Sequence, residues 1–249
     1  MKNTYEEFKK DVAFIGGPCA VEDEKTLYEI AVAVKKRGAT ALRAGAFKPR
    51  TSPYDFQGLG EEGLKILASV GKKVGLKTVS EITDVRLLDL YADIDILQVG
   101  ARNMQNFALL KELGKIDKPI IIKRGFVNTS DELLSSAEYV LSGGNERVAI
   151  CERGIRTFET STRFTLDLCS LAALKLKTEL AVIADPSHAA GDAKLVKTLA
   201  LAAIAAGADG VMIEVHTHPE NALCDGAQAI SPEVFGEMVK AAEKIKKIV

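Results

Sequence analysis

The sequence of 249 residues has almost no net charge, few cysteines and no long apolar run. Its 33 lysines and arginines oppose 34 aspartates and glutamates, and the resulting charge of −1 offers no basic surface to nucleic acid or an anionic membrane. The longest uncharged apolar stretch, residues 198–208, is too short to span a bilayer. With 20 glycines and 7 prolines, the chain is neither low-complexity nor collagen-like. We therefore expect no nucleic acid and no membrane among its partners.

Two further absences, of a secretory signal and of disulfide-type cysteine spacing, concern the cellular compartment of the protein. Residues 1–10, MKNTYEEFKK, lack the apolar core of a secretory signal. The four cysteines form no CxxC pair and show no disulfide-type spacing, which favours a reducing compartment. We therefore expect a soluble cytoplasmic enzyme. The cysteines are Cys19, Cys151, Cys169 and Cys224.

One pattern recurs along the chain: a short β-branched run, then polar or glycine-containing residues, then a stretch of helical periodicity. The predicted strands are 12–15, 40–43, 77–81, 94–99, 119–123, 147–151, 181–184 and 210–215. The predicted helices are 24–37, 61–74, 85–92, 107–113, 131–141, 166–176, 193–206 and 232–248. This alternation predicts parallel strands joined by helical crossovers, as in α/β proteins.

The number of units selects the architecture. Eight strand–helix units with almost continuously apolar strands predict a single (β/α)8 TIM barrel over residues 1–249. An open doubly wound sheet is the alternative, but no GxGxxG follows the first strand. In a barrel, catalytic residues lie where strands end, and nearly all reactive side chains that interrupt apolar runs fall there. The chain stops at Val249, just after the last predicted helix, so we expect no regulatory domain and no feedback inhibition.

Four ligand-type side chains follow the first, seventh and eighth strands, which are neighbours in a closed barrel. They are Cys19, His188, Glu214 and Asp225. A thiolate, an imidazole and two carboxylates suit one borderline divalent ion such as Mn, Fe, Co, Zn or Cu. Each residue also has an ordinary structural interpretation: a buried cysteine, a histidine that caps a loop, a glutamate paired with a barrel lysine. Their joint position favours the metal site.

Cations gather at the ends of the second, fourth, fifth and sixth strands. They are Arg43, Lys48, Arg50, Arg102, Lys123 and Arg153. Ion pairs with Glu81 and Glu152 are the structural alternative, but the cations outnumber the nearby acids. An excess of cations at buried positions predicts anionic ligands, and arginine matches phosphate and carboxylate groups. Two phosphorylated or carboxylated substrates would satisfy the count.

The connection at residues 45–60 is long for this type of barrel and carries KPRTSP. Pro49 and Pro53 stiffen it, and its aromatic residues, Phe47, Tyr54 and Phe56, favour a packed loop over a solvated basic turn. Other mechanisms have little support, because no GxSxG or Walker A sequence occurs. Lys123 as a Schiff-base lysine remains an alternative, and we expect the cysteines other than Cys19 to be structural.

These motifs resemble a known family, the 3-deoxy-D-arabino-heptulosonate 7-phosphate (DAHP) synthases, in their short type I-beta form. The resemblance runs from GGPCAVE (16–22) to LCDGAQ (223–228) and includes RAGAFKPRTSPYDFQG, LQVGARNMQN, KPIIIKRG, CERGIRTFE and DPSHAAG. It departs from the family pattern at Cys224, where serine is common, at Phe164, where asparagine is common, and at Thr217 and His218. Members condense phosphoenolpyruvate with erythrose 4-phosphate and release phosphate, the first step of the shikimate pathway of aromatic amino acid biosynthesis.

The resemblance assigns roles to the residues above. Cys19, His188, Glu214 and Asp225 fall on the metal ligands. Arg43 and Lys48 fall near the phosphoenolpyruvate carboxylate, and Arg102, Lys123 and Arg153 around its phosphate. Lys48, Pro49, Arg50 and Thr51 fall on the erythrose 4-phosphate site, with Arg50 and Thr51 at the phosphate.

The resemblance also implies a mechanism. The metal would polarise the aldehyde, carbon 3 of phosphoenolpyruvate would attack it, and water would add at carbon 2 before phosphate leaves. Lys48 is the candidate proton donor to the aldehyde oxygen, and Glu81 or a metal-bound water would activate the attacking water.

Three alternatives remain open. The sister activity, 3-deoxy-D-manno-octulosonate 8-phosphate synthase, uses arabinose 5-phosphate and carries a Lys-Ala-Asn-Arg-Ser-Ser string where this chain has KPRTS. The others are a non-catalytic barrel that binds phosphorylated metabolites and a Schiff-base aldolase. Family resemblance further implies a homodimer or homotetramer.

Overall fold

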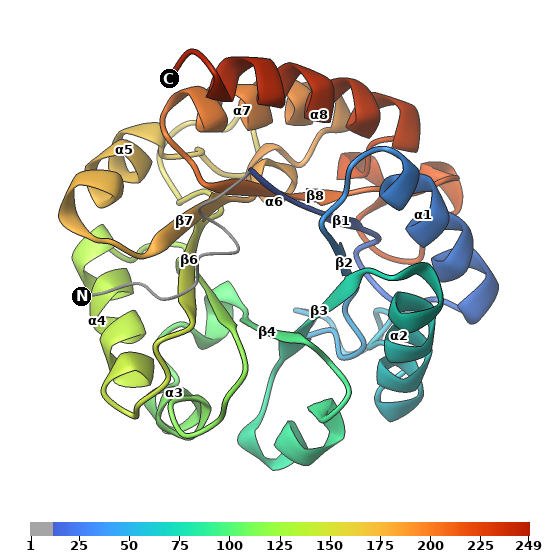
Figure 1. The fold of residues 1–249 in the computed structure, drawn as a ribbon, viewed down its shortest axis with the longest axis horizontal. Coiled ribbons are helices and arrows are strands. Elements are labelled where there is room, and N and C mark those ends of the chain that lie inside the picture. The colour runs from blue at the N-terminus through green and yellow to red at the C-terminus, as the bar shows by residue number, and fades with distance from the viewer. Residues whose placement is uncertain (1–11) are drawn as a thin grey trace.

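The apolar runs of the sequence form a closed barrel of parallel strands. The computed structural model describes residues 12–249, so the expectation about residues 1–10 lies outside the described part. Each strand pairs in parallel with the next, and β1 pairs with β8 to close the ring (Figure 1). The strands are β1 (Ala13–Gly17), β2 (Ala41–Arg43), β3 (Lys77–Ile82), β4 (Ile96–Val99), β5 (Ile120–Lys123), β6 (Val148–Glu152), β7 (Ala181–Ala184) and β8 (Gly210–Glu214).

Alternation along the strands divides the core into two parts. Residues such as Ile15, Val79, Ile121 and Ile183 pack together in one buried cluster inside the barrel. Their neighbours, such as Phe14 in β1, face outward and pack against the helices in a second cluster. Because both faces are covered, most strands are almost continuously apolar, as the sequence predicted.

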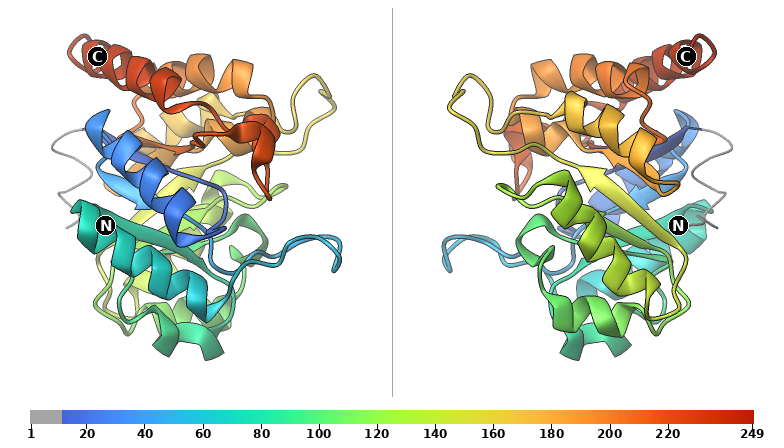
Figure 2. Two further views of the ribbon diagram at one scale, coloured as in Figure 1. Left: turned by 90° about the vertical axis from the view of Figure 1, so that its right-hand side faces the viewer. Right: turned by 90° about the vertical axis from the view of Figure 1, so that its left-hand side faces the viewer.

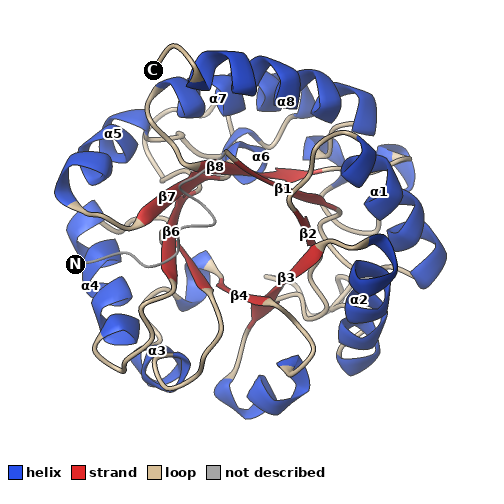
Figure 3. Cartoon of the chain, in the orientation of Figure 1, coloured by secondary structure: helices blue, strands red, loops and turns tan. Residues whose placement is uncertain are grey.

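The helices form a ring around the strands (Figure 3). The α-helices are α1 (Glu24–Lys36), α2 (Glu61–Val74), α3 (Phe107–Leu113), α4 (Ser130–Leu141), α5 (Leu168–Lys177), α6 (Pro186–Ala190), α7 (Ala193–Ala205) and α8 (Pro232–Lys246). Short 3-10 helices are η2 (Val85–Tyr91), η3 (Ala101–Asn103), η4 (Pro219–Asn221) and η5 (Gly226–Gln228). Side-chain caps mark the starts of α-helices. Asp23 accepts a hydrogen bond from the backbone of α1, and Thr129 forms a capping box with Glu132 in α4. Within the described residues, no helix has the length and apolar composition needed to cross a membrane.

The structure confirms the predicted (β/α)8 barrel and corrects it in detail. The α-helix predicted at 85–92 is wrong: the segment is the 3-10 helix η2, with Asp84 capping its start. The helix α6 was not predicted, because its five residues are too few to show helical periodicity. Most strand ends also differ by one or two residues from their predicted positions.

Two long connections project from the end of the barrel where the strands finish (Figure 2). One follows β2 and the other follows β6. The first connection was predicted to be a loop whose aromatic residues are packed, and this prediction is only partly right. Phe47 stacks on Tyr91 at 6.3 Å between ring centres and Phe56 packs on Cys19 and Cys224, but Tyr54 is 96% exposed.

Candidate active site

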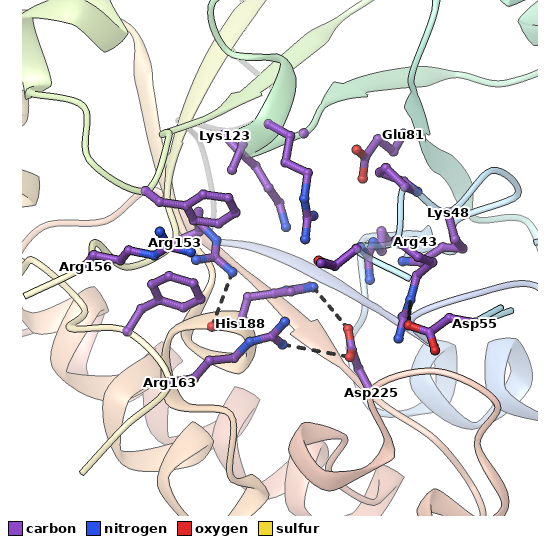
Figure 4. Close-up of a pocket in the computed structure, with 18 residues that line it drawn as sticks. Arg43, Lys48, Asp55, Glu81, Lys123, Arg153, Arg156, Arg163, His188 and Asp225 are labelled. Carbon is purple, nitrogen blue, oxygen red and sulfur yellow. Dashed lines mark hydrogen bonds and ion pairs between the residues drawn. The ribbon is translucent and has the colours of Figure 1, made fainter. Parts of the chain in front are cut away.

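A cavity of about 400 Å³ opens at the carboxyl ends of the strands (Figure 4). It is lined by every site residue expected from the sequence except Cys19 and Glu214. These two lie beside the cavity, where Cys19 contacts Lys48 and Glu214 contacts His188. The lining residues include Arg43, Lys48, Pro49, Arg50, Thr51, Glu81, Arg102, Lys123, Arg153, His188 and Asp225. The structure therefore brings together groups that come from almost every strand end.

The four expected metal ligands converge. One donor atom from each of Cys19, His188, Glu214 and Asp225 lies within 4.8 Å of the others. His188 Nε2 is 3.3 Å from Glu214 Oε1 and 4.0 Å from Asp225 Oδ2, and Cys19 Sγ is 3.4 Å from Asp225 Oδ2. The closure of β1 on β8 produces this convergence, because Gly17 pairs with Glu214. A compact set of sulfur, nitrogen and oxygen donors fits one divalent metal ion.

The DPSHAAG segment folds into the short helix α6 and fixes His188. Asp185 caps the helix, accepting a hydrogen bond from the His188 backbone at 3.0 Å. Its other carboxylate oxygen lies 2.7 Å from His188 Nδ1 and also binds Lys123. Burial lowers the pKa of His188, so its neutral form is favoured. With Nδ1 facing Asp185, Nε2 is directed to the other donors.

Asp225 has a backbone conformation that suits a constrained site. Its φ of 53° is the one positive value among the non-glycine residues of the described chain. Aspartate tolerates the left-handed region better than most residues. The following Gly226 is also constrained, since an added Cβ would lie 2.3 Å from the Pro219 carbonyl oxygen. This turn aims Asp225 at His188 and Arg163, as the dashed lines in Figure 4 show.

Glu214 is buried and charged. Arg43 Nη1 lies 2.7 Å from one of its oxygens, and Gln228 donates to the other at 2.6 Å. Burial alone would raise the pKa of Glu214, but His188 and Arg43 outweigh it and hold the pKa at about 2. The alternative in which Glu214 pairs with a lysine of the barrel is therefore wrong, because its partner is an arginine.

Cys19 lies among three other functional groups. Lys48 Nζ donates to Cys19 Sγ at 3.0 Å and to its carbonyl oxygen at 3.1 Å. Cys224 Sγ is 3.0 Å from Cys19 Sγ, and Arg50 donates to Cys224 at 2.7 Å. The hydrogen bond with Cys224 and burial raise the pKa of Cys19, so metal binding would have to displace its proton. Cys224 was expected to be structural, but it contacts both Cys19 and Arg50 and so links the metal-type donors to Arg50.

The cations expected from the sequence divide into paired and unpaired groups. Lys123 forms an ion pair with the fully buried Asp185, and Arg43 one with Glu214. Glu152 pairs with Arg124 rather than with any of the six expected cations. Glu81 accepts a hydrogen bond from Gln98 at 3.2 Å. Among the described residues, Arg102 and Arg153 have no carboxylate partner within 4 Å, so their charges remain available to an anion.

Sequence reasoning missed part of the lining. Asp55, Phe126, Arg156, Arg163 and Phe164 also face the cavity. The motif CERGIRTFE placed Arg156 near the end of a strand, so a signal for this residue existed. Phe126 gave none, since an isolated aromatic residue in a loop does not indicate which group it contacts, and Phe164 stood out only as a departure from the family pattern. Asp185 was part of a quoted motif but had no assigned role.

Comparison with known proteins agrees with this geometry. The family model described as "DAHP synthetase I family" matches residues 8–249. A phospho-2-dehydro-3-deoxyheptonate aldolase of Thermotoga maritima is 47% identical over 232 residues, which is 93% of this chain and 69% of that protein. A 2-dehydro-3-deoxyphosphooctonate aldolase of Syntrophotalea carbinolica is 33% identical over 257 residues, covering 96% and 92% of the two chains.

Solved structures give the same relationship. The crystal structure of the Thermotoga maritima phospho-2-dehydro-3-deoxyheptonate aldolase (DAHP synthase) matches with a TM-score of 0.92 and 46% identity, over 95% of this chain and 70% of that one. A truncated form of the 3-deoxy-D-arabino-heptulosonate 7-phosphate synthase from Thermotoga maritima matches with a TM-score of 0.88 and 42% identity, over 95% and 87%.

Proposed function

The chain belongs to the DAHP synthetase I family, and on that premise we propose that the cavity at the end of its barrel is the active site. The activity is that of a DAHP synthase, which condenses phosphoenolpyruvate, erythrose 4-phosphate and water to DAHP and phosphate. One observation carries the assignment of the site: a cluster of metal-type donors shares one cavity with two arginines, the buried Arg153 and the exposed Arg102, that have no carboxylate partner among the described residues.

Cys19, His188, Glu214 and Asp225 would hold one divalent ion. The mixed donor set suits borderline ions such as Mn, Fe, Co or Zn. When bound, the ion supplies a Lewis acid for the aldehyde oxygen. Asp185 and Gln228 hold His188 and Glu214 from behind, and such supporting contacts orient metal ligands.

Phosphoenolpyruvate would bind toward β4, β5 and β6. Arg102, Lys123 and Arg153 would contact its phosphate, while Arg43 and Lys48 would contact its carboxylate. Arg102 and Arg153 have no carboxylate partner among the described residues, which supports their role. Lys123 forms an ion pair with Asp185, a contact that favours its role as a charge partner of phosphate over that of a Schiff-base lysine. Preorganised charges of this kind orient the substrate without rearrangement.

Erythrose 4-phosphate would bind toward the connection after β2. Arg50 and Thr51 would contact its phosphate, and Pro49 fixes the direction in which they leave the barrel. Arg50 is anchored on Cys224 and lies 3.4 Å from Asp55, so its guanidinium already points into the cavity. The aldehyde would then lie between Lys48 and the metal-type donors.

Two proton transfers follow from this arrangement. Lys48 is buried and its amine touches Cys19, so it lies where the aldehyde oxygen gains a proton as carbon 3 of phosphoenolpyruvate attacks. Glu81 lines the cavity on β3 and would accept a proton from the water that adds at carbon 2. Gln98 holds the Glu81 carboxylate from the adjacent strand.

The proposal extends to the surroundings of the protein. A ligand thiol must remain reduced, and Cys19, Cys151 and Cys224 are free thiols, so we place the chain in a reducing compartment such as the cytoplasm. We also propose a homodimer or homotetramer, to be measured by light scattering, and a single barrel domain as the catalytic unit.

The sister activity on arabinose 5-phosphate is the competitor. Relatives of that name are 27–33% identical, well below the 47% of the heptonate aldolase. The direct test measures phosphate release by the purified protein from phosphoenolpyruvate with erythrose 4-phosphate, and from each substrate alone. Release that needs both substrates supports the proposal. Release from phosphoenolpyruvate alone, or none with any divalent metal, would refute it.

A further inference from the structure

Arg153 packs against two phenylalanine rings. Its guanidinium carbon is 4.3 Å from the ring centre of Phe164 and 4.9 Å from that of Phe126. The two rings are nearly parallel, with an interplanar angle of 11° and centres 5.1 Å apart. The three groups therefore form a compact triangle at the wall of the cavity, on the connections that follow β5 and β6.

The charge of Arg153 is buried, and no carboxylate of the described residues lies within 4 Å of it. The residue is 4% exposed, and its guanidinium donates hydrogen bonds to the carbonyl oxygens of Gly154 and His188, at 3.4 and 3.3 Å. Burial lowers the pKa of Arg153 below its usual value. Two other buried cations of the site do have carboxylate partners, since Lys123 has Asp185 and Arg43 has Glu214.

The rings provide the missing compensation. The negative face of a phenyl ring attracts a cation, and this attraction is strongest where water is excluded. A carboxylate would neutralise Arg153 and compete with an anionic substrate, whereas a ring lowers the energy of the cation and leaves its charge intact. The aromatic pair thus holds a guanidinium in place with its charge still available.

Local structure explains how Phe164 reaches Arg153. Gly154 follows Arg153 with a φ of +91°, and an added Cβ there would lie 2.7 Å from the Cβ of Phe164. The Phe164 backbone donates to the Ala189 carbonyl oxygen at 2.8 Å, which fixes the returning chain beside α6. The ring is therefore held by backbone contacts that do not involve Arg153.

Three more arginines contact the same rings. Arg102 and Arg156 lie 5.5 and 5.7 Å from the centre of Phe126, and Arg163 lies 5.9 Å from that of Phe164. Guanidinium groups gathered this closely repel one another, and the charge of Arg163 contributes to the lowered pKa of Arg153. The aromatic pair is the shared support that keeps these arginines together on one wall.

We propose that Phe126 and Phe164 are positioning residues that hold Arg153, and with it Arg102, at the phosphate of phosphoenolpyruvate. The inference rests on the proposed function, because it concerns the binding of that substrate. It assigns the aromatic pair an effect on one substrate only, since Arg50 and Thr51 lie on the connection after β2.

The test replaces a ring by an aliphatic side chain. Phe164→Leu is expected to raise the Kd of phosphoenolpyruvate in calorimetric titration, and its KM, by about fivefold to thirtyfold. The KM for erythrose 4-phosphate should change less than twofold. Phe164→Tyr, which keeps the ring, should restore the wild-type Kd. Phe158→Leu is the matched control, because Phe158 lies on the same connection and is 98% exposed.

A double-mutant cycle separates the ring's effect on Arg153 from a general effect on folding. In an Arg153→Ala background, Phe164→Leu should no longer change the Kd of phosphoenolpyruvate. A wild-type Kd for Phe164→Leu, an equal rise in both KM values, or an undiminished effect without Arg153 would overturn the proposal. Phe126→Leu provides the same readout if Phe164→Leu does not fold. If the wild-type protein binds phosphoenolpyruvate but releases no phosphate, the proposed function fails while the titration still tests the aromatic pair.

Discussion

Charged residues at the barrel mouth follow a simple division. Where a buried charge belongs to the scaffold, a partner of opposite sign lies against it, as Glu152 does for Arg124. Arg153 has aromatic rings instead, and no carboxylate lies within 4 Å of it among the residues described here. A buried charge without a partner is costly, so such positions indicate where an anionic substrate completes the site.

The first prediction concerns Arg50. Arg50→Ala would remove the proposed charge-assisted contact to the erythrose 4-phosphate phosphate and should cost roughly 2–5 kcal/mol of binding or transition-state energy. Steady-state kinetics with each substrate varied should show the loss for the aldose and little change in the KM for phosphoenolpyruvate. Arg86→Ala, on the exposed η2 helix, is the control. A defect confined to phosphoenolpyruvate would contradict the assignment.

A second prediction concerns Cys19. Cys19→Ser replaces the one thiol donor by a hydroxyl that does not ionise at neutral pH, so affinity for a divalent metal should fall. Metal content after dialysis against limiting metal gives the measurement. Cys169→Ser serves as the control, because Cys169 is exposed and remote from the donors. Equal metal content in the two variants would remove Cys19 from the ligand set.

Individual site residues were predictable where strand ends determine their position. Cys19, His188, Glu214 and Asp225 could be grouped because neighbouring strands of a closed barrel bring their ends together. Roles that depend on how a connection folds back were not predictable. The contact of Cys224 with Arg50 and Cys19 and the packing of Phe164 on Arg153 belong to this class.

At the scale of elements, the strands and longer helices were predictable from periodicity, and the short ones were not. The helix α6 shows the reason: it is held by its caps, Asp185 at the start and Gly191 in the left-handed conformation at the end. Five residues contain too little of a helical repeat to be detected. The 3-10 helix η2 has the apolar spacing of an α-helix, but it is not one.

The start of α4 offers a test of stability away from the site. Thr129 Oγ1 accepts from the Glu132 backbone at 3.2 Å, and Glu132 accepts from the Thr129 backbone at 2.7 Å. Thr129→Ala should cost about 1 kcal/mol in urea unfolding at pH 7. Ser135→Ala, on the same helix but outside the cap, should have almost no effect. A wild-type midpoint for Thr129→Ala would contradict the capping role.

The pH dependence of this cap has a definite sign. Hydrogen bonds from Thr129 lower the pKa of Glu132 in the folded state. The contribution of Glu132 is therefore complete above its unfolded pKa of about 4.3 and is lost as the pH falls through the lower folded value. The difference between wild type and Thr129→Ala should be smaller at pH 3 than at pH 7. A larger difference at pH 3 would contradict this account.

We expect the connection after β2 to determine which sugar is accepted. In the proposed site, Arg50 and Thr51 would hold the aldose phosphate at a fixed distance from Lys48, and a sugar one carbon longer would overrun that distance. Arabinose 5-phosphate should therefore show a kcat/KM at least about a hundredfold below that of erythrose 4-phosphate, a difference of about 2.7 kcal/mol. Comparable values for the two sugars would instead favour the sister activity.

At the scale of the whole molecule, the barrel supports a site that forms only when the ring closes. Cys19 stands near the start of the described chain and Asp225 near its end, yet their side chains are 3.4 Å apart because β1 pairs with β8. The donors lie at or beyond the strand ends, above a packed core, so we expect the fold to persist without the metal. The order of eight strand–helix units made the closure of the ring predictable. The shape of the cavity was not, because it depends on the side chains that line it.

The most direct test of the account is phosphate release from phosphoenolpyruvate and erythrose 4-phosphate before and after metal removal, with circular dichroism recorded on the same samples. We predict that chelation abolishes turnover, leaves the spectrum unchanged, and is reversed by adding a divalent metal ion. Full turnover by a preparation shown to be metal-free, or loss of the folded spectrum together with the metal, would contradict the account.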